Sequence, residues 1–436
     1  MTFIFNKLRF SSVRWFVLPI VCSAAVGLAL ACESDPHATL AITPTPDAGS
    51  DAPVVGPSQL DLPDQPILGL PRDLVDLFDE GDNLFELPLR DGDGLGPLYT
   101  QRSCASCHTE GARGPGFVQK MVVVEADGLT PAADQSKLPF GFTVHPLVAG
   151  GGKTPVLPPP NDPTVKVTTR VGPPVMARGY MEAVADAEIL RVEAEQRART
   201  DGIHGVANWV IYGSETTADA RFHGLKKGDR VIGRFGLKAR VPSLDDFTAD
   251  ALQGDMGITS PLRPAEIANP DGLTDDAKPG VDVPMSSVHL RAMYLRLLAI
   301  PPRPKPDAAA VALFAKSKCD VCHTPSLQAR ADYPIAAIAG KPAPLYTDML
   351  LHDMGDALAD SLPTTDGSAT WRQWRTAPLV GLRFNRTFMH DGRSKSVREA
   401  IRAHDGRGSE AAESVRIYDA LSPADQKLVD DFVAAL

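Results

Sequence analysis

The chain has 436 residues, a length that fits two or three domains of ordinary size. Its 54 Asp and Glu residues outnumber its 44 Lys and Arg residues, which excludes the broadly basic surface typical of nucleic-acid binding. The 36 glycines and 39 prolines indicate long irregular segments between modest helices.

Residues 1–31 have the pattern of an export signal. Three basic residues precede an apolar run over 15–30, which is too short to span a bilayer comfortably. The run ends in "LALAC", where a small residue precedes Cys32. This is a loose match to the site at which bacterial lipoproteins are cleaved and acylated, because leucine stands two rather than three positions before the cysteine. An ordinary cleaved signal and an uncleaved anchor are the alternatives. All of them predict a folded part outside the cytoplasm, and we favour a periplasm-facing protein anchored by lipid to the outer membrane.

Residues 32–66 are rich in Pro, Asp, Ala and Ser and show no apolar periodicity. Such a segment cannot bury enough surface to offset its chain entropy. We therefore expect a disordered tether between the lipid anchor and the folded part.

All four cysteines of the remaining chain fall in two C-x-x-C-H motifs. This motif is typical of haem c attachment, in which the two thiols form thioethers with the porphyrin and the histidine ligates the iron. A zinc ribbon would have to join cysteine pairs far apart in the chain, a redox dithiol does not require the histidine, and a disulfide within C-x-x-C would be strained. The expected attachment and ligand residues are Cys104, Cys107 and His108 in the first motif and Cys319, Cys322 and His323 in the second.

A helix is predicted before each motif, over 74–90 and over 307–318, and both segments contain a Leu-Phe pair. In the second helix, Asp307 is expected to act as N-cap. An apolar side of this helix is expected to lie against the porphyrin. That side comprises Val311, Leu313 and Phe314.

The final helix is predicted over 422–436, with Ser422 as N-cap and Pro423 in its first turn. A helix before C-x-x-C-H and a closing helix packed on it make a cytochrome c domain. We therefore expect a mainly α fold with long irregular connections and little β structure. It would comprise an N-terminal haem c domain with insertions over 67–300 and a C-terminal cytochrome c-like domain over 301–436. The apolar face of the closing helix would comprise Leu428, Val429, Phe432, Val433 and Leu436.

From about residue 70 onward the chain resembles the bacterial di-haem oxidoreductases, a peroxidase-like family also called thiol oxidoreductases and related to the di-haem cytochrome c peroxidases. The resemblance is carried by "DGLGPLYTQRSCASCHTEGARG", "GYMEAVADAEIL", "GRFGLKARVPSLDDFTADALQGDMGITSPL", "YTDMLLHDMGDALAD", "WRTAPLVGL" and "FMHDGRSKSVREAIRAHDG". It implies that His108 ligates a peroxide-reactive haem and His323 an electron-transfer haem. It further implies an oxidant such as hydrogen peroxide, a periplasmic electron donor, and possible calcium between the domains.

The resemblance also implies a sixth ligand for the second haem. In the peroxidases this ligand follows the histidine of the "HDG" motif by 14 residues, and counting from His390 gives His404. A bis-histidine haem would have a lower potential than a His/Met haem. The alternative for His404 is a surface histidine. His390 and His352 are expected to contact propionates or loops, each fixed by the aspartate that follows it.

Two catalytic candidates belong to the first haem. His145 is the only histidine between residues 108 and 204, and it lies in a Gly-rich segment that would let it move in the distal pocket. Glu182 stands where the resemblance implies a distal carboxylate, and it is expected to be desolvated, with a raised pKa, and to shuttle protons during peroxide cleavage. The alternatives are a loop histidine and an exposed glutamate at a helix start.

The sequence departs from the family pattern at Leu237, where tryptophan is usual. If that tryptophan assists electron passage, Trp209, Trp371 or Trp374 would have to replace it. The interpretation we favour is an exported di-haem peroxidase-like enzyme. The alternatives are a non-catalytic di-haem electron carrier and an accessory protein of a periplasmic metal-uptake system.

Overall fold

The computed structural model describes residues 62–216, 219–274, 279–363 and 367–436. The predicted signal, Cys32 and nearly all of the predicted tether lie outside these residues. Residues 55–436 form one compact unit, to which the whole described part belongs. Within the described ranges, no helix combines the length and the apolar character needed to cross a membrane.

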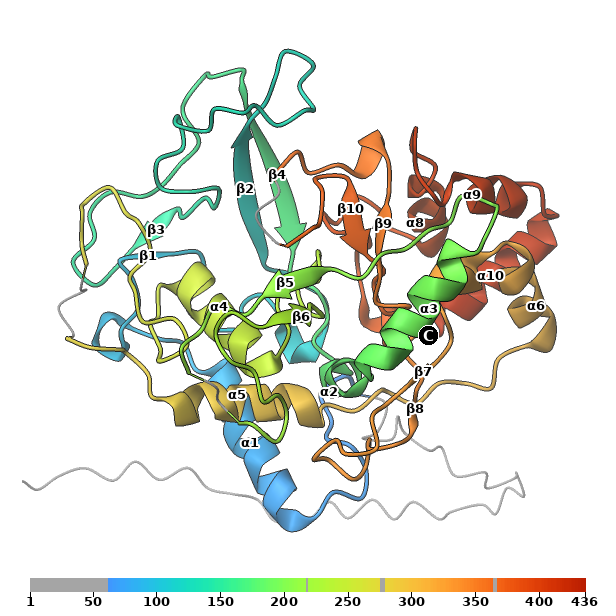
Figure 1. The fold of residues 1–436 in the computed structure, drawn as a ribbon, viewed down its shortest axis with the longest axis horizontal. Helices are drawn as coiled ribbons and strands as arrows, with labels where there is room; N and C mark the ends of the chain where they lie inside the picture. Colours follow the sequence, from blue (N-terminus) through green and yellow to red (C-terminus); the bar gives the residue numbers. More distant parts are fainter. Residues whose placement is uncertain (1–61, 217–218, 275–278, 364–366) are drawn as a thin grey trace, which may run out of the picture. The chain divides into compact units, whose positions relative to one another are not determined.

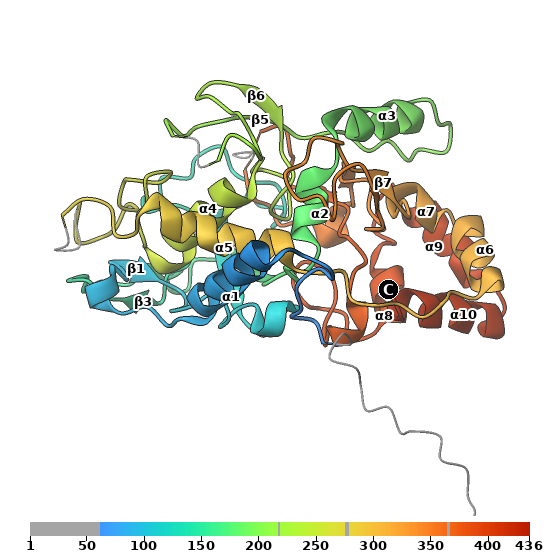
Figure 2. The same ribbon diagram turned by 90° about the horizontal axis from the view of Figure 1, so that it is seen from below.

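The helix before the first motif, α1 (Arg72–Glu86), packs against α5 (Met285–Leu297) (Figures 1 and 2). The Tyr294 ring of α5 lies between two phenylalanines of α1, with its centroid 5.2 Å from Phe78 and 4.9 Å from Phe85. Gly81 lets the two backbones come close, because a Cβ there would lie 2.3 Å from the Leu290 carbonyl oxygen. The predicted helix is confirmed, while its partner α5 was not foreseen.

The helix before the second motif, α6 (Ala308–Lys316), packs against the last helix, α10 (Pro423–Ala434). The expected caps are confirmed, since Asp307 accepts from the Ala309 amide and Ser422 from the Asp425 amide. Phe314 meets Phe432 edge-on at 5.4 Å. Val311 is 39% exposed, so its predicted place on the apolar side is wrong. Phe314 is buried as predicted, and the helix turns Ala310 inward in place of Val311.

Other helices connect and flank these two pairs. Between the two helices of the first pair in sequence lie α2 (Arg178–Ala183), α3 (Asp186–Arg197) and α4 (Leu244–Met256). The second motif forms α7 (Cys319–Cys322), and α8 (Val397–Ala403) and α9 (Ala412–Asp419) precede α10. Short 3-10 turns are η2 (Asp91–Asp93), η3 (Thr109–Gly111), η4 (Asp356–Leu358) and η5 (Leu382–Phe384).

The strands of the described residues form five two-stranded antiparallel sheets, so the fold is mixed and the expected mainly α fold is confirmed only in part. The longest pair has Phe117 opposite Val171 and Val123 opposite Val165. Both of its strands contain several valine or threonine residues, which favour extended backbone, but neither strand was predicted from the sequence. The pairs are β1 (Leu98–Tyr99) with β3 (Leu147–Val148), β2 (Phe117–Val123) with β4 (Val165–Val171), β5 (Trp209–Ile211) with β6 (Arg230–Ile232), β7 (Leu327–Gln328) with β8 (Pro342–Ala343), and β9 (Leu351–Asp353) with β10 (Gln373–Arg375).

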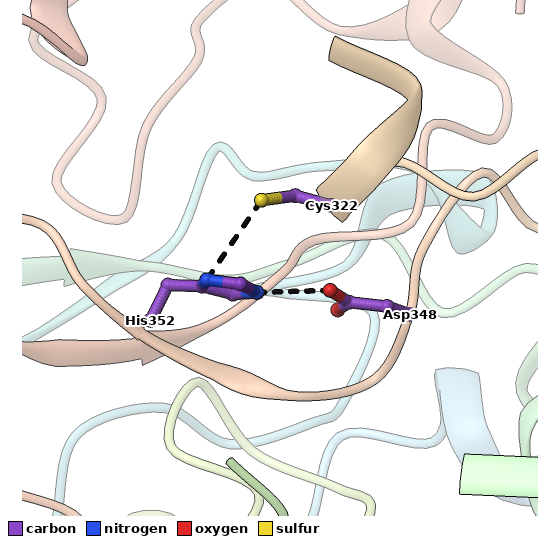
Figure 3. A group of neighbouring side chains, drawn as sticks. All are labelled: Cys322, Asp348 and His352. Carbon is purple, nitrogen blue, oxygen red and sulfur yellow. Dashed lines mark hydrogen bonds and ion pairs between the residues drawn. The ribbon is translucent and has the colours of Figure 1, made fainter. Parts of the chain in front are cut away.

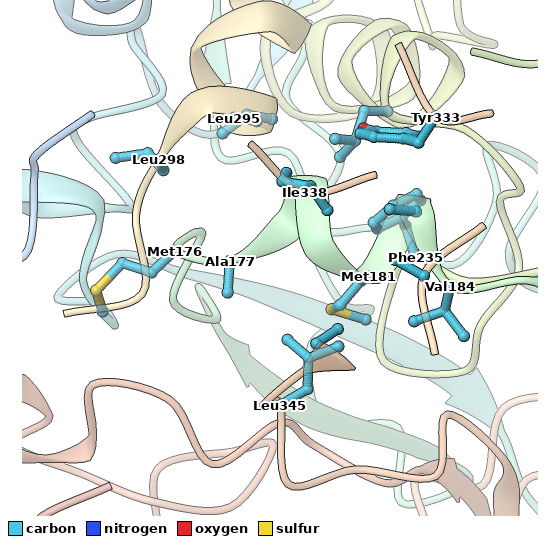
Figure 4. Close-up of a cluster of buried hydrophobic side chains, with 14 of the residues drawn as sticks. Met176, Ala177, Met181, Val184, Phe235, Leu295, Leu298, Tyr333, Ile338 and Leu345 are labelled. Carbon is cyan, nitrogen blue, oxygen red and sulfur yellow. The ribbon is translucent and has the colours of Figure 1, made fainter. Parts of the chain in front are cut away.

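The largest hydrophobic cluster joins segments from both sides of the second motif (Figure 4). Met176, just before α2, and Met181, within α2, are 1% and 0% exposed. They belong to the same cluster as Tyr333 and Ile338. A backbone bridge between Val184 and Ala329 links the same segments. The expected domain boundary between residues 300 and 301 remains a prediction.

Candidate haem centres

Each of the two C-x-x-C-H motifs forms a tight turn of its own. The His108 amide donates to the Cys104 carbonyl at 3.0 Å, and the His323 amide donates to the Cys319 carbonyl at 2.9 Å. Burial raises the pKa of the Cys107 and Cys319 thiols to about 12. A redox-active dithiol needs a thiolate at neutral pH, so neither motif has that chemistry.

His108 is held by the segment that follows β4. Its Nδ1 donates to the Pro173 carbonyl at 2.7 Å, and burial lowers the pKa of the ring to about 4. The ring is therefore neutral, with a lone pair left on Nε2. Two glycines allow the approach: a Cβ on Gly172 would lie 2.6 Å from the Cys107 carbonyl oxygen, and a Cβ on Gly116 would lie 2.4 Å from the Cys107 sulfur. The glycine after the first motif thus serves close packing on it.

At the second motif, two histidines have a ring held by a backbone carbonyl, as the His108 ring is at the first. His323 Nδ1 donates to the Tyr346 carbonyl at 3.0 Å, and His404 Nδ1 donates to the Ala400 carbonyl at 2.7 Å. Burial lowers the pKa of both rings. Both histidines line one mostly apolar cavity of about 260 Å³, together with Cys319 and Cys322. Two neutral imidazoles with available Nε2 atoms and two thiols at an apolar cavity fit a haem with two axial histidines.

His390 and His352 line the same cavity but are committed to other partners. The His390 ring stacks on Trp374, with centroids 4.0 Å apart, and its Nε2 lies 4.0 Å from Asp391. His352 is not fixed by the aspartate that follows it, because its Nε2 donates to Asp348 at 2.8 Å and its Nδ1 to Glu410 at 2.7 Å.

Cys322, Asp348 and His352 lie close enough to resemble a metal site (Figure 3). However, both nitrogens of His352 face carboxylates, which requires the doubly protonated ring. Accordingly, the pKa of His352 is raised well above its ordinary value despite burial, through the charge and the hydrogen bond of Asp348. An imidazolium cannot ligate a metal, so this cluster is an ion-paired support beside the second motif.

The expected raised pKa of Glu182 is wrong. Its side chain is fully buried as expected, but Arg296 binds it through two nitrogens, with Nε at 2.7 Å from Oε2 and Nη2 at 3.0 Å from Oε1. The Tyr333 hydroxyl and the Leu244 amide also donate to it, at 2.9 and 2.8 Å. Although burial acts to raise the pKa of Glu182, Arg296 lowers it well below the ordinary value. A carboxylate held this firmly in its charged form is a structural ion pair.

His145 is buried and held on two sides. It is 5% exposed, its backbone bridges Val156, and its Nε2 donates to the Gly254 carbonyl at 2.9 Å. The Nδ1 atom makes no hydrogen bond within the described residues. The ring therefore has an anchor at the end of α4, next to Asp255, and its role at the first haem remains a prediction.

Asp255 is a candidate that the sequence reasoning missed. It lies in the last turn of α4, and its carbonyl accepts the Thr100 amide at 2.7 Å. Burial raises the pKa of its carboxyl group to about 6, opposed by Lys120, and its charge helps to raise the pKa of both thiols of the first motif. Burial in turn lowers the pKa of Lys120 to about 8. One signal was available, because an acidic residue in a last helical turn is electrostatically unfavourable.

Leu237 and Trp374 both line the cavity of the second motif. They are neighbours in space, because the amide of Arg375, the next residue after Trp374, donates to the Leu237 carbonyl at 2.9 Å. Lys238 Nζ lies 4.2 Å from the centroid of the Trp374 ring. A cation over an indole makes removal of an electron from it harder. Trp374 therefore lies in a suitable place to pass electrons in the absence of a tryptophan at position 237, but the nearby positive charge of Lys238 makes its oxidation less favourable.

A family model described as "di-haem oxidoreductase, putative peroxidase" matches residues 161–436, more than half of the chain. The protein is thus an oxidoreductase of a class that uses haem cofactors. The chain belongs to the di-haem oxidoreductase family. The match begins after the first motif.

Two solved structures are similar to a lesser degree. Hydrazine synthase of Kuenenia stuttgartiensis, studied under xenon pressure, is 12% identical with a TM-score of 0.33, covering 92% of this chain and 100% of that one. A variant of the di-haem peroxidase BthA from Burkholderia thailandensis is 16% identical with a TM-score of 0.30, covering 76% and 71%. At these TM-scores neither likeness carries an argument. No curated protein matches the chain.

Proposed function

We propose that this protein is an exported peroxidase that carries two covalently attached c-type haems, in two cytochrome c-like domains over 67–300 and 301–436. One observation carries the proposal: the two motifs have different surroundings. The second faces a further histidine with an available Nε2, His404, whereas the first has an ionisable pair, Asp255 and Lys120, beside it.

When bound, haem at the first motif supplies the iron at which hydrogen peroxide is reduced. His108 would hold that group, with its ring orientation fixed by the Pro173 carbonyl. Reduction of peroxide to two water molecules moves a proton from the inner to the outer oxygen and consumes two further protons and two electrons. A carboxyl group with a pKa near the working pH can accept and return such a proton. With its pKa at about 6, Asp255 fits this role, which Glu182 does not.

The second motif serves electron entry. His323 and His404 would both ligate the haem iron, which would leave no position for peroxide and would favour a low potential. Electrons come from a periplasmic donor and pass to the first centre. His145, which donates to the carbonyl of Gly254, the residue before Asp255, is kept as a second candidate at that centre. Calcium between the domains is kept as a further cofactor of the proposal.

Export and anchoring complete the proposal. Acylation of Cys32 would hold the folded part at the periplasmic face of the outer membrane, with residues 32–66 as tether. Cys32→Ser should move the protein from the membrane fraction to the soluble fraction and abolish incorporation of labelled palmitate. An unchanged distribution would leave an uncleaved anchor as the explanation.

The decisive experiment is an EPR spectrum of the purified holoprotein before and after addition of hydrogen peroxide. We expect one high-spin or exchangeable ferric haem that changes with peroxide, and one low-spin haem. Cyanide should bind to one haem per chain. Two low-spin signals that ignore both peroxide and cyanide would instead identify an electron carrier.

A further inference from the structure

The cavity of the second motif is lined by arginines that have no acidic partner. Arg178, the first residue of α2, is 5% exposed, and Arg375, the last residue of β10, is 7% exposed. The half-buried Arg113 also lines the cavity. Within the described residues, no carboxylate lies within ion-pair distance of any of the three.

The hydrogen bonds of the two buried arginines go to neutral acceptors. Arg178 donates to the Pro174 carbonyl and to the Met181 sulfur, the latter at 2.9 Å. Arg375 donates from Nε to the Gly236 carbonyl at 3.2 Å and from Nη1 to the Thr376 carbonyl at 2.8 Å. Its Nη2 makes no hydrogen bond to any described residue. Each guanidinium is held in place while keeping part of its donor edge for another group.

Burial and the charge of Arg375 lower the pKa of Arg178 to about 9. Burial also lowers the pKa of Arg375 to about 10, and the charge of Asp348, which is not within ion-pair distance, opposes this only in part. Buried charges without a partner are costly, and natural interiors pair them. The one carboxylate that lines the cavity, Glu410, is already paired with His352. The missing negative charge must therefore arrive with the occupant.

The chemistry of that charge follows from the receptor. Two guanidinium forks, each planar and rich in donors, suit carboxylates better than they suit a point anion. The same cavity holds the thiols and histidines of the second C-x-x-C-H site, and a porphyrin of haem carries two propionate carboxylates. We propose that Arg178 and Arg375 bind the propionates of the haem attached at Cys319 and Cys322. This inference rests on the proposed function, because it requires haem at that motif.

The test compares Arg375→Gln and Arg178→Gln with the wild-type holoprotein and with Arg407→Gln as control. Arg407 is an arginine of the same part of the chain, but its side chain is 90% exposed and is paired with Asp356. Haem content is measured by pyridine haemochrome. The midpoint potential of the low-spin haem is then measured by spectroelectrochemistry from pH 6 to pH 9.

We expect both cavity variants to shift the potential of the low-spin haem downward at high pH, because an unpaired propionate favours the ferric state. Their potential should also fall as pH rises through neutrality, because a propionate without its cation takes up a proton on reduction. Arg375→Lys, which keeps the charge, should largely restore the wild-type values. The control should match the wild type.

Two results would overturn the assignment. One is a potential in both cavity variants that equals the control at every pH while two haems are present. The other is a wild-type potential that moves with added acetate or inorganic phosphate, in a way lost in Arg375→Gln, since this would identify a soluble anion. If the Gln variants lose the second haem, the Lys variants decide: loss there too means that packing, not charge, matters. Wild-type protein without two haems would instead defeat the proposed function itself.

Discussion

The two C-x-x-C-H sites share their local geometry and differ in what surrounds them. In both, the histidine after the second cysteine donates from Nδ1 to a backbone carbonyl, of Pro173 in one case and of Tyr346 in the other. At the second site α8 adds His404, while at the first α4 adds Asp255. The local geometry of each site is thus set within five residues, whereas the difference between the two surroundings comes from helices remote in sequence.

The supporting helices make the same comparison. In each half, the helix before the motif packs on a later helix through aromatic side chains, Phe78 and Phe85 on Tyr294 in one half and Phe314 on Phe432 in the other. The two sites thus share a supporting pair of helices and differ in the side chains added beside the motif. Such a difference is what a division between a reactive and an electron-transfer centre requires.

The largest expected effect tests the carboxyl group at the first site. Asp255→Asn should slow oxidation of the chemically reduced protein by hydrogen peroxide by roughly 10²- to 10⁴-fold, because it removes the group that moves the proton. Stopped-flow absorbance measures this rate. Asp271→Asn, at an exposed loop, is the control. A rate within twofold of wild type would remove Asp255 from the mechanism.

The second effect is on stability. Glu182→Gln should lower the free energy of unfolding by about 3–5 kcal/mol, because it leaves the buried Arg296 with Asp245 as its main counter-charge. Urea unfolding measures the loss, with Glu413→Gln, which removes a partly exposed ion pair with Arg416, as control. Folded holoprotein should still react with peroxide at close to the normal rate. Normal stability with a slow peroxide reaction would return Glu182 to the role first expected for it.

The third effect converts the second site into one that resembles the first. His404→Ala should open a coordination position, so that cyanide bound per chain about doubles and the low-spin spectrum is lost. His390→Ala is the matched control, because His390 lines the same cavity but stacks on Trp374. Cyanide titration followed by optical spectroscopy gives the stoichiometry. If His404→Ala still binds a single cyanide, His404 is not the ligand.

The smallest effect is on pH dependence. Asp255 must be ionised to accept a proton, and its pKa is raised to about 6. The peroxide rate should therefore fall by up to about tenfold for each pH unit below 6, and this slope should be absent in Asp255→Asn. Between the unfolded pKa of about 3.9 and the folded pKa, the folded state binds more protons. Asp255 should therefore make stability fall as pH rises from about 4 to 6.

Sequence reasoning reached the parts of this molecule that local pattern controls. The two motifs, the helix before each of them and the caps Asp307 and Ser422 depend on neighbours a few residues away. The family was also identified correctly, because its motifs are linear.

Long-range electrostatics escaped it. Glu182 differs from Asp255 because Arg296 binds the Glu182 carboxylate, whereas burial of α4 near the first motif desolvates Asp255. Nothing within either local segment shows which of the two carboxylates has a bound arginine. The β2–β4 pair was missed for a related reason, since its strands find each other across a long intervening segment.

The segment from Pro173 to Arg178 belongs to both centres at once. The Pro173 carbonyl orients His108, the Pro174 carbonyl accepts from Arg178, and Arg178 faces the second cavity. Proline restricts φ, so this short run has little slack. A displacement of this segment would therefore move groups at both centres. A substitution that shifts this segment to change the position of His108 should therefore also change the position of Arg178 in the second cavity.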